Sequence, residues 1–303
     1  MPAVWIPAAL TAGLFQAWRT AIQQKLRTRL SVSGAGLVRY LYGAPVALLL
    51  LTLWLALRGE GVAVPGWRFL AFAFGGGLAQ ILATSALIAA FGHRGFLVGT
   101  AFSKTEALQA ALFSIVVLGE HLPLLAWLGI FCGVGGVMVL GLAGRTKGLA
   151  GIAVQFAERG AQLGLLSGAL FALTAVMIRL ATHEIESTSP VSQALLTLAA
   201  VNLLQTLMHG TWIAWREPTT LLLVLRGWRS AVPVGVLSAC GSACWFLGFA
   251  TAPVALVRVI GQVEVVFTFG FAHFYLREPV HPNEAIGLAL VSIGVVLALI
   301  GVL

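Results

Sequence analysis

Ten apolar stretches, each about as long as a membrane-spanning helix, dominate the sequence. An α-helix needs about 20 apolar residues to cross the hydrocarbon core of a bilayer. Only 9% of the 303 residues are charged, whereas soluble domains average about 25%. The sequence therefore predicts an all-α integral membrane protein with ten transmembrane helices. The stretches lie at roughly residues 3–22, 34–57, 68–91, 95–118, 123–143, 161–182, 191–215, 229–250, 254–276 and 283–303.

Short connections separate these stretches, and the longest polar break runs from Arg145 to Arg159. The break leaves five apolar stretches on either side. We therefore expect a first five-helix repeat at residues 1–144, a linker loop at 145–160 and a second five-helix repeat at 161–303. No segment is long or polar enough to form a separate soluble domain.

The two halves repeat one another at a constant offset. Glu106 and Glu264 lie 158 residues apart, and the same offset relates further charged, glycine and aromatic positions. Because five spans is an odd number, the second copy must enter the membrane from the opposite side. The sequence thus predicts an inverted repeat, with a central cavity and a site near midplane at the repeat interface. The further pairs are Glu120 and Glu278, Gly129 and Gly287, Gly136 and Gly294, and Phe91 and Phe249.

The basic residues lie mainly between the apolar stretches rather than along one surface. The net charge of +8 therefore serves to orient the chain in the bilayer and does not indicate nucleic-acid binding. Three Lys and Arg residues fall on the face that holds both termini, and thirteen fall on the opposite face. The positive-inside rule then places both termini of an inner-membrane protein outside the cytoplasm. The smaller set is Arg58, Arg68 and Arg179, and the larger is Arg19, Lys25, Arg27, Arg29, Arg39, Arg94, Arg145, Lys147, Arg159, Arg216, Arg226, Arg229 and Arg277.

Two carboxylates, Glu106 and Glu264, lie near the middle of predicted spans. A charge at this depth costs about 2.5–3.5 kcal/mol on insertion scales, so such residues are usually functional. Lys104 and Arg258 lie in the same two spans. Two acids and two bases near midplane indicate a substrate that carries both signs, such as an amino acid, or an anion bound by the bases. The alternative interpretation is structural, with Lys104 or Arg258 neutralising a carboxylate across a helix contact.

Helical spacing adds further candidates. On a regular helix, Gln109 shares a face with Glu106. Lys104 lies about 200° around such a helix from Glu106 and should point elsewhere unless the helix is broken near Gly99. The predicted substrate or proton-coupling residues are Glu106, Glu264, Lys104, Arg258, Gln109, Gln262, Gln16 and Trp245.

Charged and aromatic residues near the span ends receive structural interpretations. We expect Arg19 and Arg179 to extend towards the lipid headgroups, and Tyr40 to anchor in the aromatic belt. Glu120 and Glu278 should cap the next helix or pair with cations at headgroup level.

The ends of both halves carry a related pattern. One reads SKTEALQAALFSIVVLGEHLPLLAWLGIFCGVGGVMVL and the other GQVEVVFTFGFAHFYLREPVHPNEAIGLALVSIGVVLALIG. Each has a mid-helix Glu, a connection with a second Glu, and a closing helix punctuated by glycines. The chain resembles the EamA branch of the drug/metabolite transporter superfamily. The resemblance implies a ten-helix inverted-repeat transporter with a central cavity, in a family that exports amino acids or other metabolites. It also implies cytoplasmic termini, contrary to the charge count.

The expected function is secondary-active transport of a small polar metabolite such as an amino acid, by an exporter or exchanger that works through alternating access. A buried carboxyl group favours its protonated form, so proton coupling is a hypothesis. No Walker motif is present, and Cys240 and Cys244 lack His partners for a metal. We therefore predict no cofactor, no metal and no enzymatic activity, and one chain should suffice without an oligomer. The alternatives are a lipid flippase of the same fold and an intramembrane enzyme that uses the two carboxylates as acid and base.

Overall fold

The computed structural model describes residues 4–94, 101–142, 158–187, 189–277 and 284–301, and every regular element in these ranges is helical. This confirms the all-α prediction. Seven segments in the described ranges are long and apolar enough to cross a membrane, which is the pattern of a multi-pass membrane protein. They are Val32–Arg58, Trp67–His93, Ala101–Leu118, Arg159–His183, Pro190–Arg216, Trp228–Thr251 and Val254–Tyr275.

Each of the ten predicted stretches overlaps at least one helix. Two of the three remaining stretches form the apolar helices α7 and α15. The third forms α1, which has 22 residues but carries Gln16, Arg19 and Gln23 on its buried surface. The helices are α1 (Trp5–Leu26), α2 (Val32–Leu41), α3 (Gly43–Arg58), α4 (Trp67–Arg94), α6 (Glu106–Leu118), α7 (Leu124–Leu142), α9 (Arg159–His183), α10 (Pro190–Arg216), α11 (Pro218–Arg226), α12 (Trp228–Thr251), α13 (Val254–Gly261), α14 (Glu264–Gly270), the π-helical η1 (Phe271–Tyr275) and α15 (Glu284–Ile300).

Three predicted spans are interrupted rather than continuous. The second divides at Tyr42 into α2 and α3. The fourth is broken by a turn at residues 104–105, immediately before α6. The ninth divides into α13, α14 and η1, with a turn at residues 262–263. The short helix α11 was not predicted; it begins at Pro218, a residue that suits the first position of a helix because its fixed φ matches the helical value.

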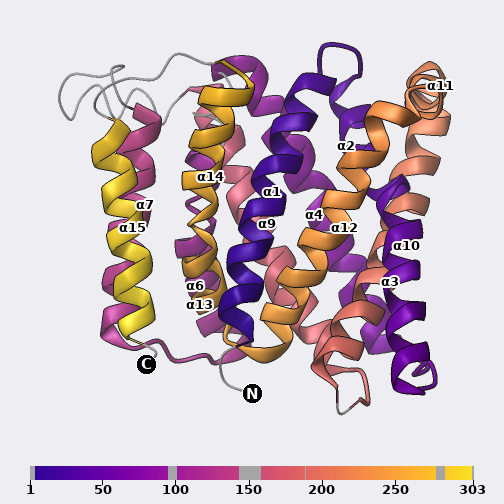
Figure 1. Cartoon of the computed structure of the whole chain (residues 1–303), viewed down its shortest axis with the longest axis horizontal. Coiled ribbons are helices and arrows are strands. Elements are labelled where there is room, and N and C mark those ends of the chain that lie inside the picture. Colours follow the sequence, from indigo (N-terminus) through magenta and orange to yellow (C-terminus); the bar gives the residue numbers. More distant parts are fainter. Residues whose placement is uncertain (1–3, 95–100, 143–157, 188, 278–283, 302–303) are drawn as a thin grey trace.

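The two halves of the sequence are interleaved in space. The most extensive helix contacts pair α4 with α9, α7 with α15, and α1 with α12. Each of these pairs joins a helix from before residue 143 to one from after residue 157. In Figure 1, α7 and α15 lie together at one edge of the bundle, and the start of α1 and the end of α15 lie on the same side. The interior of the molecule is therefore built from both halves together.

Glycines allow α7 and α15 to approach closely. A Cβ on Gly129 would lie 2.6 Å from the carbonyl oxygen of Gly294, and a Cβ on Gly136 would lie 2.7 Å from that of Gly287. Between them, Cys132 Sγ contacts the carbonyl oxygen of Leu290 at 3.4 Å. Small residues at a helix interface in this way let the two backbones pack directly.

The charge count needs one correction. Arg19 and Arg39 were assigned to the face opposite the termini, but each is only 3% exposed and lies inside the bundle. Their removal from the count leaves the excess of basic residues on the same face. Arg145 and Lys147, which also entered the count, lie outside the described residues, as does most of the predicted linker.

Candidate functional site

Both mid-span carboxylates stand at the start of a helix that follows a break. Glu106 is the first residue of α6 and Glu264 is the first residue of α14. The backbone N–H groups that follow are bonded to the turn before each helix, since Ala107 donates to the carbonyl oxygen of Lys104 and Val265 to that of Gln262. The turn at residues 104–105 also corrects the prediction for Lys104. Because the helix is not regular there, Lys104 points towards Glu106 instead of away from it.

Four buried charges form a network between the two halves. Lys104 Nζ donates to Glu264 Oε2 at 2.7 Å and to Glu106 Oε1 at 3.4 Å. Arg258 Nη1 donates to the same Glu106 oxygen at 3.4 Å. None of the four side chains is more than 5% exposed. Lys104 and Glu106 from the first half are thus neutralised by Glu264 and Arg258 from the second.

Gln16 and Trp245 extend this network. Gln16 Nε2 donates to Glu264 Oε2 at 2.7 Å, and Trp245 Nε1 donates to Gln16 Oε1 at 2.9 Å. The Arg258 guanidinium lies over the Trp245 ring, 4.7 Å from its centroid, which is a favourable cation–π distance. Six of the eight predicted site residues therefore meet in one cluster, which we call the central network: Gln16, Lys104, Glu106, Trp245, Arg258 and Glu264.

The other two predicted residues lie beside the central network without a bond to it. Gln109 Nε2 makes a long contact of 3.5 Å with the carbonyl oxygen of Leu165, on α9. Gln262 is 2% exposed, and neither polar atom of its side chain has a partner within the described part of the protein. Its carboxamide packs so closely on α7 that a Cβ on Gly133 would collide with it.

A second group of cations was misassigned from the sequence. Arg19 does not reach the headgroups, because its side chain is buried, and its Nη2 donates to Thr20 Oγ1 at 3.3 Å. Arg39 is equally buried and donates to Thr84 Oγ1 at 3.1 Å and to Ser242 Oγ at 3.4 Å. The interior position of Arg19 could have been predicted from the sequence of α1, because Gln16, Thr20 and Gln23 recur at helical spacing and form a polar interior face.

The position of Tyr40 also differs from the prediction. It was expected in the aromatic belt, but its side chain is fully buried. Its hydroxyl donates to the carbonyl oxygen of Gln80 at 3.1 Å and lies 3.2 Å from Thr84 Oγ1. A buried phenol needs such partners, so Tyr40 belongs to the interior polar group around Arg39.

Glu120, which lies between α6 and α7, connects three helices. Its Oε1 lies 3.0 Å from Arg179 Nε, and its carboxylate accepts from the backbone N–H of Val254 at 3.0 Å. Glu120 therefore caps α13 rather than α7, the next helix. Arg179 is part-buried and also donates to the carbonyl oxygens of Phe249 and Ala252, both at 2.6 Å. Glu278, the counterpart of Glu120, lies outside the described residues.

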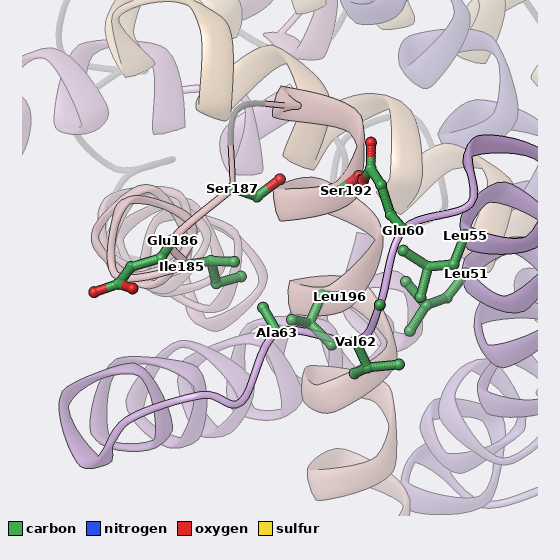
Figure 2. Close-up of a pocket in the computed structure, with 11 residues that line it drawn as sticks. Leu51, Leu55, Glu60, Val62, Ala63, Ile185, Glu186, Ser187, Ser192 and Leu196 are labelled. Carbon is green, nitrogen blue, oxygen red and sulfur yellow. The ribbon is translucent and has the colours of Figure 1, made fainter.

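One hollow lies away from the central network. A pocket of about 500 Å³ is lined by residues of α3, α10 and two connecting segments, including Glu60, Ile185 and Ser192. Figure 2 shows Glu60 and Ser192 pointing towards each other, and Ser192 Oγ donates to Glu60 Oε2 at 2.6 Å. Neither Glu106 nor Glu264 lines this pocket, so the network residues pack against one another instead of facing it. In the described ranges, no three His, Cys, Asp or Glu side chains gather closely enough to hold a metal ion.

Comparison with known proteins agrees with this arrangement. A solved structure, described only as "Crystal structure of protein", is similar in fold with a TM-score of 0.75 over 99% of this chain and 97% of that one. The two sequences are 17% identical, so this likeness concerns the fold alone. A search of curated proteins finds no match. Residues 158–300 match the EamA-like transporter family, which implies a lipid bilayer and a small-molecule substrate. The second half of this chain is therefore an EamA-like transporter domain, which confirms the resemblance to the drug/metabolite transporter superfamily.

Proposed function

We propose that the protein is a secondary-active transporter that moves a small polar metabolite across the inner membrane by alternating access. The observation that carries this proposal is the central network, in which Glu106 of the first half and Glu264 of the second share the ammonium group of Lys104. Buried charges at membrane depth are expensive and usually mark a transport pathway. Here they lie at the contact between the two halves, where a substrate would have to pass.

The proposal includes ten helices in two inverted repeats, at residues 1–144 and 161–303, joined by a linker at 145–160. Reciprocal contacts support this. Gly129 meets Gly294 and Gly136 meets Gly287, and each contact maps onto the other when 158 is added to one residue number and subtracted from the other. Two contacts that exchange in this way are expected across a two-fold axis.

The surroundings of the two carboxylates are reciprocal as well. A Cβ on Gly13, in α1, would lie 3.3 Å from the backbone nitrogen of Glu264. A Cβ on Gly168, in α9, would lie 3.2 Å from that of Glu106. The first helix of each half therefore packs on the helix break of the other half. Discontinuous helices at a repeat interface are the usual substrate site in transporters of this kind.

Ion pairs that cross between the halves suit an alternating mechanism. Opening a pathway through the central network must separate Lys104 from Glu264 and Arg258 from Glu106, which would strand charges in a medium of low dielectric constant. A substrate with polar groups of its own, or a proton on a carboxylate, can replace the lost partner. Glu120 and Arg179 hold α6, α9 and α13 together at one side, so this conformation would be closed there. The network is complete in one chain, so no oligomer is needed.

A lipid flippase is a second candidate, favoured by one surface feature. An apolar groove of about 470 Å³ lies along α1, α14 and η1, lined by side chains such as Leu14, Phe267 and Phe274. Glu264 begins the same α14, so a lipid tail in this groove would lie near the central network. An acid–base enzyme is less well supported, since the hydrogen-bond partners of the two carboxylates in the described structure are Lys104, Arg258 and Gln16.

Reconstitution in liposomes tests the proposal. Uptake of radiolabelled amino acids, carboxylic acids and fluorescent lipids should be measured with and without a pH gradient. We expect one class to be transported, and Glu106→Gln and Glu264→Gln to abolish that transport. Glu184→Gln is the matched control, because this carboxylate is partly exposed and its ion pair within the described residues is a long contact of 3.9 Å with Arg68. Full activity in both network variants would refute the role of the central network.

A further inference from the structure

The interior of the protein carries more positive than negative charge. In the described part of the chain, four Lys and Arg side chains are at most 5% exposed: Arg19, Arg39, Lys104 and Arg258. Among the described residues, only two carboxylates are buried to this extent, Glu106 and Glu264. Four cations against two anions leave an excess of two positive charges inside the bundle.

The two carboxylates are already engaged by Lys104 and Arg258. The excess charge therefore resides on Arg19 and Arg39. Within the described part of the chain, neither guanidinium forms an ion pair; Arg39 contacts two hydroxyl groups and Arg19 contacts one. The Nε of Arg19 is buried and has no hydrogen-bond acceptor among the described residues.

A guanidinium group cannot relieve this situation by losing its proton, because arginine stays charged in proteins. An unpaired charge in the interior costs several kcal/mol. The planar guanidinium is also the side-chain group best matched to a carboxylate or phosphate, which it can bind through two parallel hydrogen bonds. The missing partner of Arg19 and Arg39 is thus an anion.

The two arginines adjoin the central network. Arg19 follows Gln16 by three residues on α1, and Ser242, which Arg39 contacts, precedes Trp245 by three residues on α12. Both positions are therefore about one helical turn from the bond that joins Gln16 to Trp245. The charge of Arg19 is close enough to be repelled by that of Arg39 and attracted by those of Glu264 and Glu106.

We propose that the substrate is a small organic anion, and that its carboxylate or phosphate group binds between Arg19 and Arg39. This inference rests on the proposed transport function and narrows its substrate class. A neutral zwitterion would leave the excess of two positive charges in place, whereas a dicarboxylate or a phosphate ester would remove it. The polar groups of the central network then face the remainder of the substrate.

Binding to the purified full-length protein tests the inference. Thermal unfolding should be followed in detergent with succinate, inorganic phosphate, leucine or putrescine at one ionic strength set with potassium chloride. We expect succinate, phosphate or both to raise the melting temperature, and leucine and putrescine to leave it unchanged. Stabilisation by succinate indicates a carboxylate ligand, and stabilisation by phosphate indicates a phosphate ligand. Either result supports the inference. Stabilisation by leucine or putrescine, without stabilisation by either anion, would overturn it.

Variants assign the effect to the two arginines. Arg19→Gln and Arg39→Gln should each weaken anion binding on the order of tenfold to a hundredfold, as expected for loss of a hydrogen bond to a charged group. Arg29→Gln is the matched control, since Arg29 is exposed. Without anion, Arg19→Gln should melt no lower than the wild type, because an uncompensated charge has been removed. An unchanged anion effect in both variants would overturn the inference.

Transport assays separate this inference from the function on which it rests. If anions bind through Arg19 and Arg39 but no solute crosses the membrane, the transport function fails and the anion site stands. If leucine is transported and the anions do not bind, the anion site fails and the transport function stands.

Discussion

Lys104 is the cation shared by the two buried carboxylates, and its removal should destabilise the folded protein. In Lys104→Met, the amide of Gln16 is the one remaining hydrogen-bond donor to Glu264 among the described residues, and Arg258, at 3.4 Å, is the one remaining donor to Glu106. The methionine fills a similar volume, so the change removes charge with little loss of packing.

The magnitude follows from the burial of the pair. The side chains of Lys104 and Glu264 are 4% and 2% exposed, so water screens their interaction very little. Removing one partner of a buried ion pair costs about 3–5 kcal/mol, because the other charge is left unpaired. The chain has 303 residues, and an unfolding entropy of about 2.1 cal/mol/K per residue means that each kcal/mol lowers the melting temperature by about 1.6 °C, which gives a decrease of roughly 5–8 °C.

The assay is thermal unfolding in detergent, followed by the fluorescence of the nine tryptophans. The double variant Lys104→Met with Glu264→Gln should recover most of the lost stability, since neither charge is stranded. Arg68→Gln is the control: Arg68 makes a 3.9 Å contact with Glu184 and its side chain is 65% exposed, so the expected change is within about 1 kcal/mol. A Lys104→Met protein that melts with the wild type, or a double variant that melts no higher than Lys104→Met, would refute the reasoning.

Three further predictions concern packing, pH and hydrogen bonding. Gly129→Ala should destabilise the protein by about 1–3 kcal/mol, because its Cβ would overpack the close contact between α7 and α15; Gly135→Ala, with open space around its Cβ, should melt like the wild type, and equal melting of both variants would contradict the contact. Burial raises the pKa of Glu120 above its usual 4.5, so the folded state holds a proton more tightly than the unfolded chain. The free energy of unfolding should therefore fall as the pH rises from 4.5 to the raised pKa. Glu120→Gln should remove this pH dependence when the melting temperature is measured over the same pH range. An unchanged slope of melting temperature against pH would rule out the assignment to Glu120. Trp245→Phe keeps a ring but loses the bond to Gln16 at 2.9 Å, so we expect about 1 kcal/mol of destabilisation and weaker substrate binding in liposomes; wild-type behaviour in both assays would show that this bond contributes nothing.

Hydropathy predicted the helices, and the matched positions of Glu106 and Glu264 singled out these two carboxylates. The apolar stretches predicted the helices because a bilayer-spanning segment must satisfy its backbone hydrogen bonds internally. Glu106 and Glu264 stood out because a charge within such a stretch is costly wherever its neighbours lie. These properties belong to the local sequence, so no knowledge of the packing was needed. In the structure, Lys104 contacts both acids, and their role in one site stays a prediction.

Packing decided which polar residues near the span ends are interior. Arg19 and Tyr40 could have reached the interface, and the choice depended on the helices beside them, where Thr84 and Ser242 supply hydroxyl groups to the same interior region. The turn before Glu106 likewise became visible only in three dimensions, because the residues around it are compatible with a continuous helix.

The pairing of helices from opposite halves also belonged to the tertiary structure. Apolar helices carry little information about their partners, since lipid and protein offer similar environments to an aliphatic side chain. Contacts between small residues and between charges supply the missing specificity. The acids could therefore be identified from hydropathy and spacing alone, whereas the two arginines without a carboxylate partner emerged only when the helices were assembled.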